Sequence, residues 1–427
     1  MPVIAVIGAQ WGDEGKGKII DLLSEKADMV VRFSGGDNAG HTVINPQGDF
    51  KLHLVPSGIF YRGATCILGN GVVINPTSLI AELDDLQKHG VDTSRLFISD
   101  RAHLIMPYHL VLDRLEEQRR GQSAIGTTLK GIGPAFTDKY ARQGIRAGDL
   151  LNREAFKIRL ASVLELKNAI IEKVYGGQPL SLEEIFKQYC AYADRLGSRI
   201  RQTEIMVQEA VSRKQTILME GAQGTLLDPD FGTYPYTTSS SPLSASAALG
   251  AGLAPCQINH IMGVAKSYTT RVGGGPMPTE LKDKTGDLIR ERAQEFGTTT
   301  GRARRCGWFD AVAVKFAVRI NGMHSIALTR LDILDIFPTV KICTGYKVYD
   351  KVIDWFPSDI AVLEKCQPVY EELPGWQTPT SGIREFKKLP KQARQYVERL
   401  EKLLSCPASI ISVGARREET ITVRRLT

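Results

Sequence analysis

Long apolar runs are missing from this chain of 427 residues. No segment approaches the roughly 20 consecutive apolar residues that a membrane-spanning helix needs. The N-terminus also lacks the basic and then apolar segment of a secretory signal, because it leads straight into a predicted strand. These two absences predict a cytoplasmic protein.

Cysteine is scarce and unpatterned: the seven cysteines are odd in number, widely spaced and never form a C-x-x-C pair. This distribution argues against a disulfide framework and against a zinc site, so we expect reduced cysteines that mostly serve packing. A long basic run is missing too, although lysine and arginine outnumber the acidic residues by 54 to 47. Small anionic substrates explain that excess equally well, and we expect no nucleic-acid partner.

Low-complexity linkers and internal repeats are absent as well. With 43% hydrophobic residues, the chain is predicted to be globular. We therefore expect a single domain over residues 1–427. A helical insertion is expected at about residues 152–213, because two long helices without a chemical motif are predicted at 153–175 and 182–213.

A glycine-rich turn near the N-terminus, residues 10–18 with the sequence QWGDEGKGK, is the most informative stretch. It follows an apolar run that predicts a buried strand over residues 3–7, and a helix is predicted to open at about Lys16. Glycine lets backbone N–H groups approach phosphate oxygens, and the helix N-terminus adds further donors. Because Lys16 and Lys18 add positive charge, the stretch predicts a phosphate-binding loop.

Two features of this loop are unusual. Asp13 and Glu14 bring carboxylates to a place where they would repel phosphate. The glycine spacing and the following lysine fit the P-loop pattern, but Ile19 stands in place of its metal-binding Ser or Thr. A metal ion would therefore need another ligand, and Asp13 is a candidate. The alternative is a structural glycine turn with a solvated, charged tip.

Short predicted strands alternate with predicted helices along the chain. The strands cover residues 29–33, 66–68, 96–99, 216–220, 258–264, 325–328 and 409–413. This rhythm favours an α/β fold with a central, mostly parallel sheet flanked by helices. Polar loops follow several strands, and we expect them to meet at the carboxyl edge of the sheet and line one crevice. The glycine-rich segment 121–149 is predicted to be a substrate loop or, alternatively, a disordered surface insertion.

Seven motifs occur in a fixed order along the sequence. They are QWGDEGKGK (10–18), GGDNAGHT (35–42), GIGPA (131–135), EGAQGTLLD (220–228), GTYPYTTSS (232–240), TRVGGGPMPTE (270–280) and TGRARRCGWFD (300–310). Together they resemble the adenylosuccinate synthetase family, and the match runs in register from Val3 to Gly414. The resemblance implies a P-loop-NTPase-like α/β fold with helical and loop insertions.

The resemblance also implies a reaction. IMP and L-aspartate would be joined at the expense of GTP, with Mg²⁺, to give adenylosuccinate, GDP and phosphate. The path would run through a 6-phosphoryl-IMP intermediate, and the reaction would be the first committed step of AMP synthesis from IMP. The implied enzyme is therefore a GTP-dependent ligase of purine biosynthesis.

A catalytic pair implied by the resemblance explains the acid in the phosphate loop. Asp13 matches the family's base, which removes the proton on N1 of IMP so that O6 can accept the phosphoryl group. Asp13 would also ligate Mg²⁺, together with the backbone carbonyl of Gly40. His41 matches the family's acid, which donates to the oxygen bridging the β- and γ-phosphates. Outside a matching motif, a single loop histidine is more often an ordinary surface residue.

The binding residues implied by the resemblance fall into three groups. For IMP they are Asn38, Thr128, Gln223, Thr238, Val272 and Arg302, with Arg142 reaching the IMP of the neighbouring subunit in a homodimer. For aspartate they are Thr298, Thr299, Thr300, Arg302 and Arg304, the arginines acting as carboxylate clamps. For GTP they are Gly12, Glu14, Gly15, Lys16, Gly17, Lys18, Thr42, Arg304, Arg330, Asp332, Ser412 and Gly414. Without the resemblance, Arg142 and the arginine cluster at 302–305 would be interpreted as solvated surface charge.

The guanine site departs from the family pattern in two places. Asp332 can accept hydrogen bonds from N1–H and the 2-amino group of guanine, which favours GTP over ATP. Arg330 stands where lysine is usual; since arginine also stacks on purines, we expect GTP use to survive with an altered affinity. After Gly414, the residues at 415–417 depart from the usual glycine-proline-aspartate pattern, so contacts beyond this turn are not assigned.

Two other functions were weighed. One is a GTP-binding switch that hydrolyses GTP slowly and signals through loop ordering. The other is a different phosphoryl-activating ligase, or a kinase, acting on another carbonyl substrate. A switch needs neither Asp13 and His41 nor a set of IMP-like polar loops, so the ligase is favoured.

Overall fold

A ten-stranded sheet forms the centre of the molecule in the computed structural model, which describes residues 2–45, 48–296, 301 and 303–426. The strand order is β20 (Thr420–Thr422), β19 (Ala408–Ser412), β15 (Ser325–Thr329), β11 (His260–Lys266), β1 (Val3–Gly8), β10 (Ile217–Glu220), β2 (Met29–Arg32), β5 (Thr65–Leu68), β7 (Leu96–Ser99) and β9 (Ile200–Arg201). All neighbouring pairs are parallel except β19 and β20. The predicted α/β fold with a mostly parallel central sheet is confirmed.

Strand β1 lies in the middle of this sheet, and all of its residues are buried. Its register aligns Ile4 with Leu218 of β10 on one side and with His260 of β11 on the other. A strand covered on both faces needs no polar alternation, which is why its sequence, VIAVIG, is continuously apolar. The N-terminal strand is therefore the centre of the core rather than an edge.

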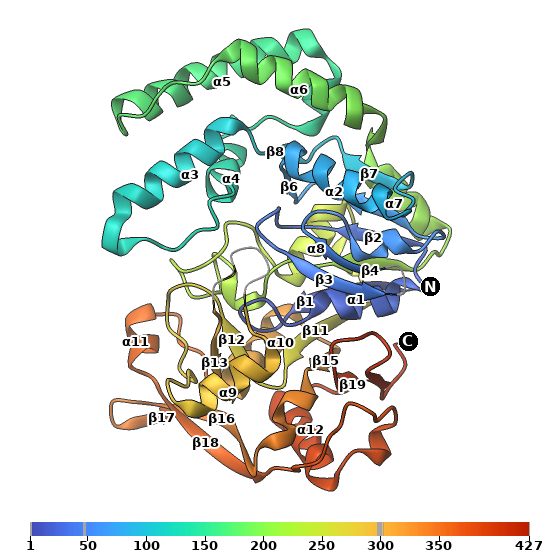
Figure 1. The fold of residues 1–427 in the computed structure, drawn as a ribbon, viewed down its shortest axis with the longest axis vertical. Helices are drawn as coiled ribbons and strands as arrows, with labels where there is room; N and C mark the ends of the chain where they lie inside the picture. The colour runs from blue at the N-terminus through green and yellow to red at the C-terminus, as the bar shows by residue number, and fades with distance from the viewer. Residues whose placement is uncertain (1, 46–47, 297–300, 302, 427) are drawn as a thin grey trace.

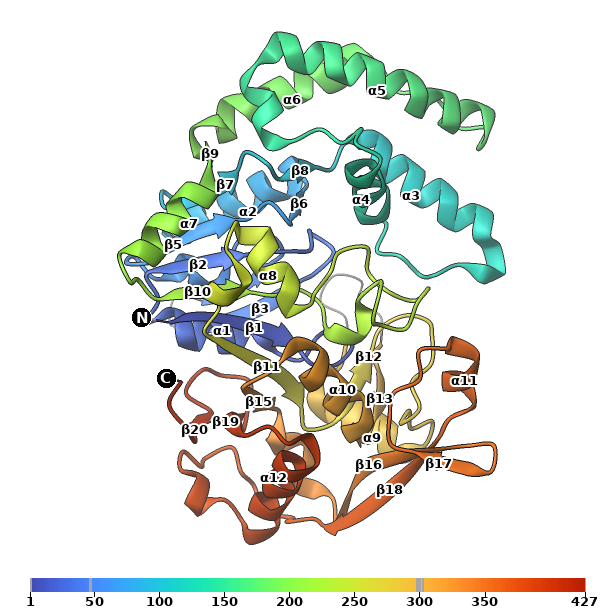
Figure 2. The ribbon, with the colours of Figure 1, turned by 180° about the vertical axis from the view of Figure 1, so that it is seen from behind.

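Helices cover both faces of the sheet (Figures 1 and 2). Ile4 and Val6 of β1 belong to the core under α1 (Lys16–Ser24) and α2 (Pro76–Lys88). Val3, Ala5 and Ile7 point to the opposite core. That core is covered by α7 (Thr203–Ser212), α8 (Ser244–Ala251), α9 (Lys284–Ala293), α10 (Ala311–Asn321) and α12 (Lys391–Leu404).

A helical layer lies beyond the β7 end of the sheet, at the top of Figure 1. It consists of α3 (Pro107–Arg120), α4 (Ile132–Tyr140), α5 (Arg153–Lys173) and α6 (Leu182–Leu196). The predicted long helix 182–213 is wrong, because α6 ends at Leu196 and residues 200–201 pair with β7 before α7 begins. The predicted loop 121–149 contains α4, whose Ile132, Ala135 and Phe136 are buried at helical spacing.

Smaller sheets complete the fold at the bottom of Figure 1 and around the glycine-rich loops. One sheet contains β14 (Phe309–Asp310), β16 (Thr339–Val348), β17 (Lys351–Ile353) and β18 (Gln367–Pro374), with α11 (Ile360–Lys365) between the last two strands. Three strand pairs are β3 (His41–Asn45) with β4 (Gly48–Leu52), β6 (Val73–Ile74) with β8 (His103–Leu104), and β12 (Thr269–Arg271) with β13 (Arg305–Gly307). The sequence patterns predicted none of these pairings.

Within the described part of the chain, no helix has both the length and the apolar character that a membrane crossing requires.

Candidate functional site

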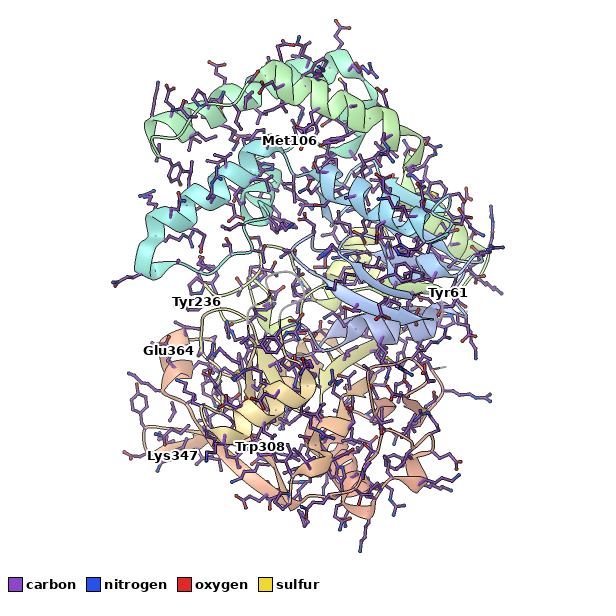
Figure 3. The ribbon with its side chains drawn as sticks, in the orientation of Figure 1. Tyr61, Met106, Tyr236, Trp308, Lys347 and Glu364 are labelled. Carbon is purple, nitrogen blue, oxygen red and sulfur yellow. The ribbon has the colours of Figure 1, made fainter. Side chains whose placement is uncertain are left out.

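Loops from neighbouring strands converge at the carboxyl edge of the central sheet. Strands β19, β15, β11, β1, β10 and β2 are consecutive in the sheet, and each is followed by one of the polar or glycine-rich loops. A cavity of about 1180 Å³ opens between these loops and helices α3 and α4. Figure 3 labels one of the residues that line it, Tyr236, on the loop after β10. The predicted crevice at this edge therefore exists.

Most of the predicted site residues that the structure describes line this one cavity. They are Gly12, Asp13, Gly15, Lys16, Gly17, Lys18, Asn38, Gly40, Thr42, Thr128, Gln223, Thr238, Val272, Arg304, Arg330, Ser412 and Gly414. They come from both ends and the middle of the sequence, so the topology of the sheet, rather than proximity in the chain, brings them together.

The phosphate loop has the geometry of an anion site. Gly15 is the N-cap of α1 with a φ of 88°, a left-handed conformation that glycine adopts without strain, and it provides no capping side chain. The first N–H groups of α1 therefore lack a side-chain cap at the cavity wall. Lys16 also lines the cavity and adds a full positive charge.

Glu14, which was expected to conflict with phosphate, is fully buried beneath the loop. Its Oε1 accepts hydrogen bonds from the backbone N–H groups of Gln10 at 3.0 Å and Gly12 at 2.9 Å. Its Oε2 forms an ion pair with Lys16 at 2.6 Å. Glu14 therefore shapes the loop from inside and is not among the residues that line the cavity.

Lys18 connects the phosphate loop to the C-terminal turn. Its ammonium donates to Ser412 Oγ at 2.7 Å and to the carbonyl oxygens of Gly414 and Glu419, both at 2.9 Å. Burial lowers the pKa of Lys18 to about 8, although the charge of Glu419 opposes this shift. The contribution of Lys18 to a nucleotide site therefore includes fixing the turn at Ser412.

Asp13 lies where the phosphate loop faces the arginine-rich segment. Its Oδ2 accepts a hydrogen bond from Arg304 Nε at 2.7 Å, and its side chain is 33% exposed. Asp13 has a φ of 59°, and three other implied site residues, Arg142, Gln223 and Arg330, also have positive φ values. Such conformations cost of order 1–3 kcal/mol and persist only where the surroundings fix them, which is typical of functional sites.

The guanine-site residues expected from the sequence meet beside Lys18. Asp332 Oδ1 is buried, has no hydrogen-bond partner among the described residues, and lies 4.0 Å from Arg330 Nε. Burial raises the pKa of Asp332, with Arg330 opposing this effect. A buried acceptor without a donor is costly, so this oxygen is suited to a ligand that supplies an N–H group.

The expected IMP residues form a hydrogen-bonded row. Gln223 Nε2 donates to Asn38 Oδ1 at 3.2 Å, and Ser240 connects Gln223 Oε1 at 3.4 Å with Thr238 Oγ1 at 3.3 Å. The loop that carries Thr128 is held on each side by one carboxylate of α3: Asp113 accepts from Thr127 Oγ1 at 2.9 Å and from Gly131 N at 2.8 Å. These side chains offer neutral donors and acceptors, as a ribose phosphate and a purine edge require.

Two expected residues that the structure describes, Arg142 and Asp332, are not among the residues that line the cavity. Arg142 is exposed. His41 begins β3 opposite Leu52, and its side chain lies outside what the structure describes. Thr298, Thr299, Thr300 and Arg302 lie outside the described residues.

Other residues near the site were given no role from the sequence, although Arg271 lies within the motif at 270–280. Arg271 is buried over the ring of Trp11, 5.6 Å from its centroid, and donates to the carbonyl oxygens of Tyr236 at 3.1 Å and Pro276 at 2.7 Å. It therefore joins the loops that carry Thr238 and Val272. Lys266, Tyr268 and Glu295 form a buried cluster behind Arg304. Only their positions in three dimensions reveal these roles.

Two kinds of oxygen ligand for a divalent cation occur at the cavity wall, a carboxylate and a backbone carbonyl. Among the described residues, no group of three or more His, Cys, Asp or Glu side chains is arranged to hold a metal ion. Asp13 and Gly40 both line the cavity and offer a carboxylate and a backbone carbonyl. Mg²⁺ commonly binds through one or two protein oxygens and takes its other ligands from substrate phosphates and water.

Comparisons with known proteins agree on one family. The sequence model described as adenylosuccinate synthetase matches residues 5–421. An adenylosuccinate synthetase from Dehalococcoides mccartyi is 58% identical over 421 residues, covering 99% of this chain and 100% of the relative. One from Heliobacterium modesticaldum is 55% identical over 99% of both chains.

Solved structures agree as well. The fully ligated adenylosuccinate synthetase from Plasmodium falciparum superposes with a TM-score of 0.93 at 37% identity, over 99% of this chain and 100% of that one. A cyanophage succinoaminodeoxyadenylate synthetase shares the fold at 19% identity, with a TM-score of 0.62 over 99% of this chain and 95% of that one.

Proposed function

Because the chain belongs to the adenylosuccinate synthetase family and thus makes adenylosuccinate from IMP and aspartate using GTP, we propose that the cavity described above carries out both steps of this ligation. In the first step O6 of IMP attacks the γ-phosphorus of GTP, and GDP leaves. In the second step the amine of aspartate attacks C6, and phosphate leaves. The observation that carries this assignment is the position of Asp13: it lies in the phosphate loop, lines the cavity and accepts a hydrogen bond from Arg304.

Asp13 is the proposed base of the first step. It would remove the proton on N1 of IMP, which turns the neutral O6 carbonyl into a nucleophile. The carboxylate fits this role because it lines the cavity at the end of β1, next to the N-terminus of α1 where the phosphates would lie. His41, which follows Gly40 and begins β3, is proposed as the acid that donates to the oxygen bridging the β- and γ-phosphates.

Asp13 and the backbone carbonyl of Gly40 would hold Mg²⁺ at the cavity wall. When bound, the cation neutralises charge on the phosphate oxygens. Asp13 fits both assignments because a carboxylate has about four lone-pair sites, and the Arg304 bond at Oδ2 uses only one of them. This arrangement compensates for Ile19, which cannot replace the metal-binding hydroxyl of the P-loop pattern.

Arg304 is proposed to bind the carboxylate of the substrate aspartate, together with Arg302 and the threonines at 298–300. A guanidinium can hold a carboxylate with two parallel hydrogen bonds. Asp332 is proposed to recognise the guanine base of GTP, which its unpartnered Oδ1 supports. Arg330 would lie near the base in place of the usual lysine.

The protein is proposed to act as a cytoplasmic homodimer in which Arg142 completes the site of its neighbour. The exposure of Arg142 outside the lining of its own cavity supports this. To test it, inactive Asp13→Asn and Arg142→Leu proteins are mixed under conditions that exchange subunits. If each site is shared by two subunits and the subunits mix at random, up to a quarter of the sites would contain both an intact Asp13 and an intact Arg142. Activity should therefore reappear. If activity does not return although mixed dimers form, Arg142 does not act across the interface.

A direct assay tests the proposed sequence of steps. The protein is mixed with Mg²⁺, GTP, IMP and aspartate, and the ultraviolet change of 6-amino purine formation is followed together with phosphate release. Release of phosphate should require IMP and should accompany product. Phosphate released from GTP alone would instead support a slow GTP-hydrolysing switch, and phosphate without product would support another phosphoryl-activating enzyme.

A further inference from the structure

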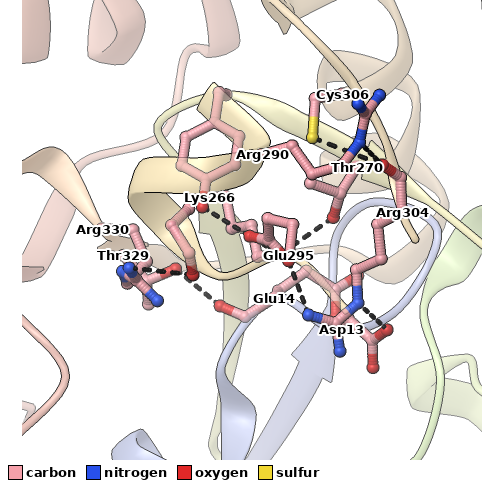
Figure 4. A network of polar contacts seen from close by, with 12 residues as sticks. Asp13, Glu14, Lys266, Thr270, Arg290, Glu295, Arg304, Cys306, Thr329 and Arg330 are labelled. Atoms are coloured by element: carbon pink, nitrogen blue, oxygen red, sulfur yellow. Dashed lines mark hydrogen bonds and ion pairs between the residues drawn. The ribbon is translucent and has the colours of Figure 1, made fainter. Parts of the chain in front are cut away.

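Glu295 lies at the centre of a buried polar cluster behind the cavity (Figure 4). Its Oε1 accepts hydrogen bonds from Lys266 Nζ and from the hydroxyl of Tyr268, both at 2.5 Å. Its Oε2 accepts a hydrogen bond from Arg304 Nη1 at 2.6 Å. The residue is 1% exposed, so water contributes little to its solvation.

Within the cluster, the negative charge of Glu295 is compensated by the cations of Lys266 and Arg304 and not by water. Lys266 is also buried and donates a further hydrogen bond to Thr270 Oγ1 at 2.9 Å. Burial alone would raise the pKa of Glu295, but the charges of Lys266 and Arg304 outweigh it and lower this pKa to about 2. Glu295 therefore presents a carboxylate to Arg304 over the whole working range of pH.

Arg304 is held at two of its guanidinium nitrogens. Nη1 is bound to Glu295 at 2.6 Å and Nε to Asp13 at 2.7 Å. The backbone N–H of Arg304 also donates to the carbonyl oxygen of Glu295 at 2.9 Å. Arginine is a flexible side chain, and fixing it before a ligand arrives removes an entropy cost from binding. The remaining N–H donors of the guanidinium are the ones that a ligand can use.

We propose that Glu295 is a positioning residue for the ligation: it fixes the Arg304 guanidinium so that one side faces Asp13 and the other receives the carboxylate of the substrate aspartate. Lys266 and Tyr268 hold Glu295 in turn. This inference rests on the proposed function, because it takes Arg304 to be the aspartate clamp. Neither Glu295 nor Lys266 lines the cavity, so both act through Arg304.

The test compares steady-state constants of Glu295→Gln with those of the parent. The amide keeps the size of the side chain but removes the charge that orients Arg304. KM for aspartate should rise about tenfold to a hundredfold, while KM for GTP and for IMP changes less than about threefold. The matched control is Glu371→Gln. Glu371 lies on β18, outside the cavity lining, and accepts a hydrogen bond from Arg399 at 2.7 Å, so this change also removes the carboxylate partner of an arginine. Its constants should equal those of the parent.

A double-mutant comparison separates positioning from general damage. When Arg304→Gln is already present, adding Glu295→Gln should raise KM for aspartate by less than about twofold, because the two residues act as a unit. If the effects of the two substitutions on KM for aspartate multiplied in the double variant, the inference would be overturned. If Glu295→Gln does not fold, Tyr268→Phe removes a single hydrogen bond to the same carboxylate and should still raise KM for aspartate about threefold.

The two proposals fail differently. An unchanged KM for aspartate in Arg304→Gln would refute the clamp itself, whatever Glu295 does. A raised KM in Arg304→Gln together with an unchanged KM in both Glu295→Gln and Tyr268→Phe would refute the positioning role alone.

Discussion

The ammonium of Lys18 donates a hydrogen bond to Ser412 Oγ at 2.7 Å across 394 residues of sequence. This contact joins α1, which follows the phosphate loop, to the last residue of β19, where the turn toward β20 begins. The phosphate and base ends of the proposed GTP site are therefore connected by a half-buried cation. Two further bonds, to the carbonyl oxygens of Gly414 and Glu419, strengthen the same connection.

Lys18→Met should raise KM for GTP at least about tenfold at pH 7, because three hydrogen bonds to the base turn are lost. The pH dependence should change as well. Since the pKa of Lys18 is about 8, the parent loses one of three donated hydrogen bonds as the pH rises through this value. Its affinity for GTP should therefore fall between pH 7 and pH 9, as measured by calorimetric titration. An equal fall in Lys18→Met would contradict the assignment.

Asp13→Asn should bind GTP within about threefold of the parent and lose turnover by about 10²- to 10⁴-fold, the usual range for a general base. The amide has a similar shape but cannot take the proton from N1. Calorimetry gives the first quantity and initial rates give the second. Asp354→Asn, with a largely exposed side chain after β17, is the control and should leave both unchanged. Turnover near that of the parent in Asp13→Asn would remove Asp13 as the base.

Asp332→Asn should weaken GTP binding about tenfold or more, because the amide replaces one of two acceptor oxygens by a donor that opposes guanine N–H groups. Arg330→Lys is the companion variant and should change GTP affinity by less than about tenfold, since both side chains place a cation near the base. Calorimetric titration with GTP and ATP checks both. The parent and Arg330→Lys should prefer GTP; a parent that binds ATP equally well would contradict the role of Asp332.

His103 should make the protein less stable in mild acid. Burial, followed by the charges of Lys139 and Arg146, lowers the pKa of His103 to about 4 from 6.5. Between these values the unfolded chain binds more protons than the folded protein, so the free energy of unfolding falls as the pH decreases from about 6.5 to 4. By pH 5 this loss should be about 1 to 2 kcal/mol.

Urea unfolding at pH 7 and pH 5 checks this prediction. His103→Gln should show a smaller difference between the two values than the parent does. His89→Gln, which changes an exposed side chain directly after α2, should show the same difference as the parent. If both variants behave alike, His103 is not the group responsible.

The parts of the fold that could be predicted from sequence are those whose signal is local. Strands β1 and β7 are each encoded by a mostly apolar run, so their bounds were predicted to within one residue. Helix α4 was missed because Gly131, Gly133 and Pro134 hide a helix of nine residues in a glycine-rich segment. The β3–β4 hairpin was missed because its strands become recognisable only through their pairing.

The candidate site shows the same division. Asp13, Lys16 and the glycines around them lie in one continuous motif, and the structure brings them to the cavity wall. Glu295 could not be predicted, because its partners Lys266 and Arg304 lie 29 residues before it and nine after it, and neither Glu295 nor Lys266 lies in a motif. The charge balance inside a protein depends on burial, which no local pattern in the sequence specifies.

The central position of β1 has a consequence for the order in which the molecule can form. This strand is made before both of its neighbours in the sheet, which begin only at Ile217 and His260. Until those strands are made, an apolar strand has neither edge paired, and closing such distant pairings is slow. The ammonium of Lys18 can form its hydrogen bonds to Ser412 and Glu419 only when residues 412–419 have been made. A chain that stops short of them would contain nearly every motif and still lack the completed nucleotide site.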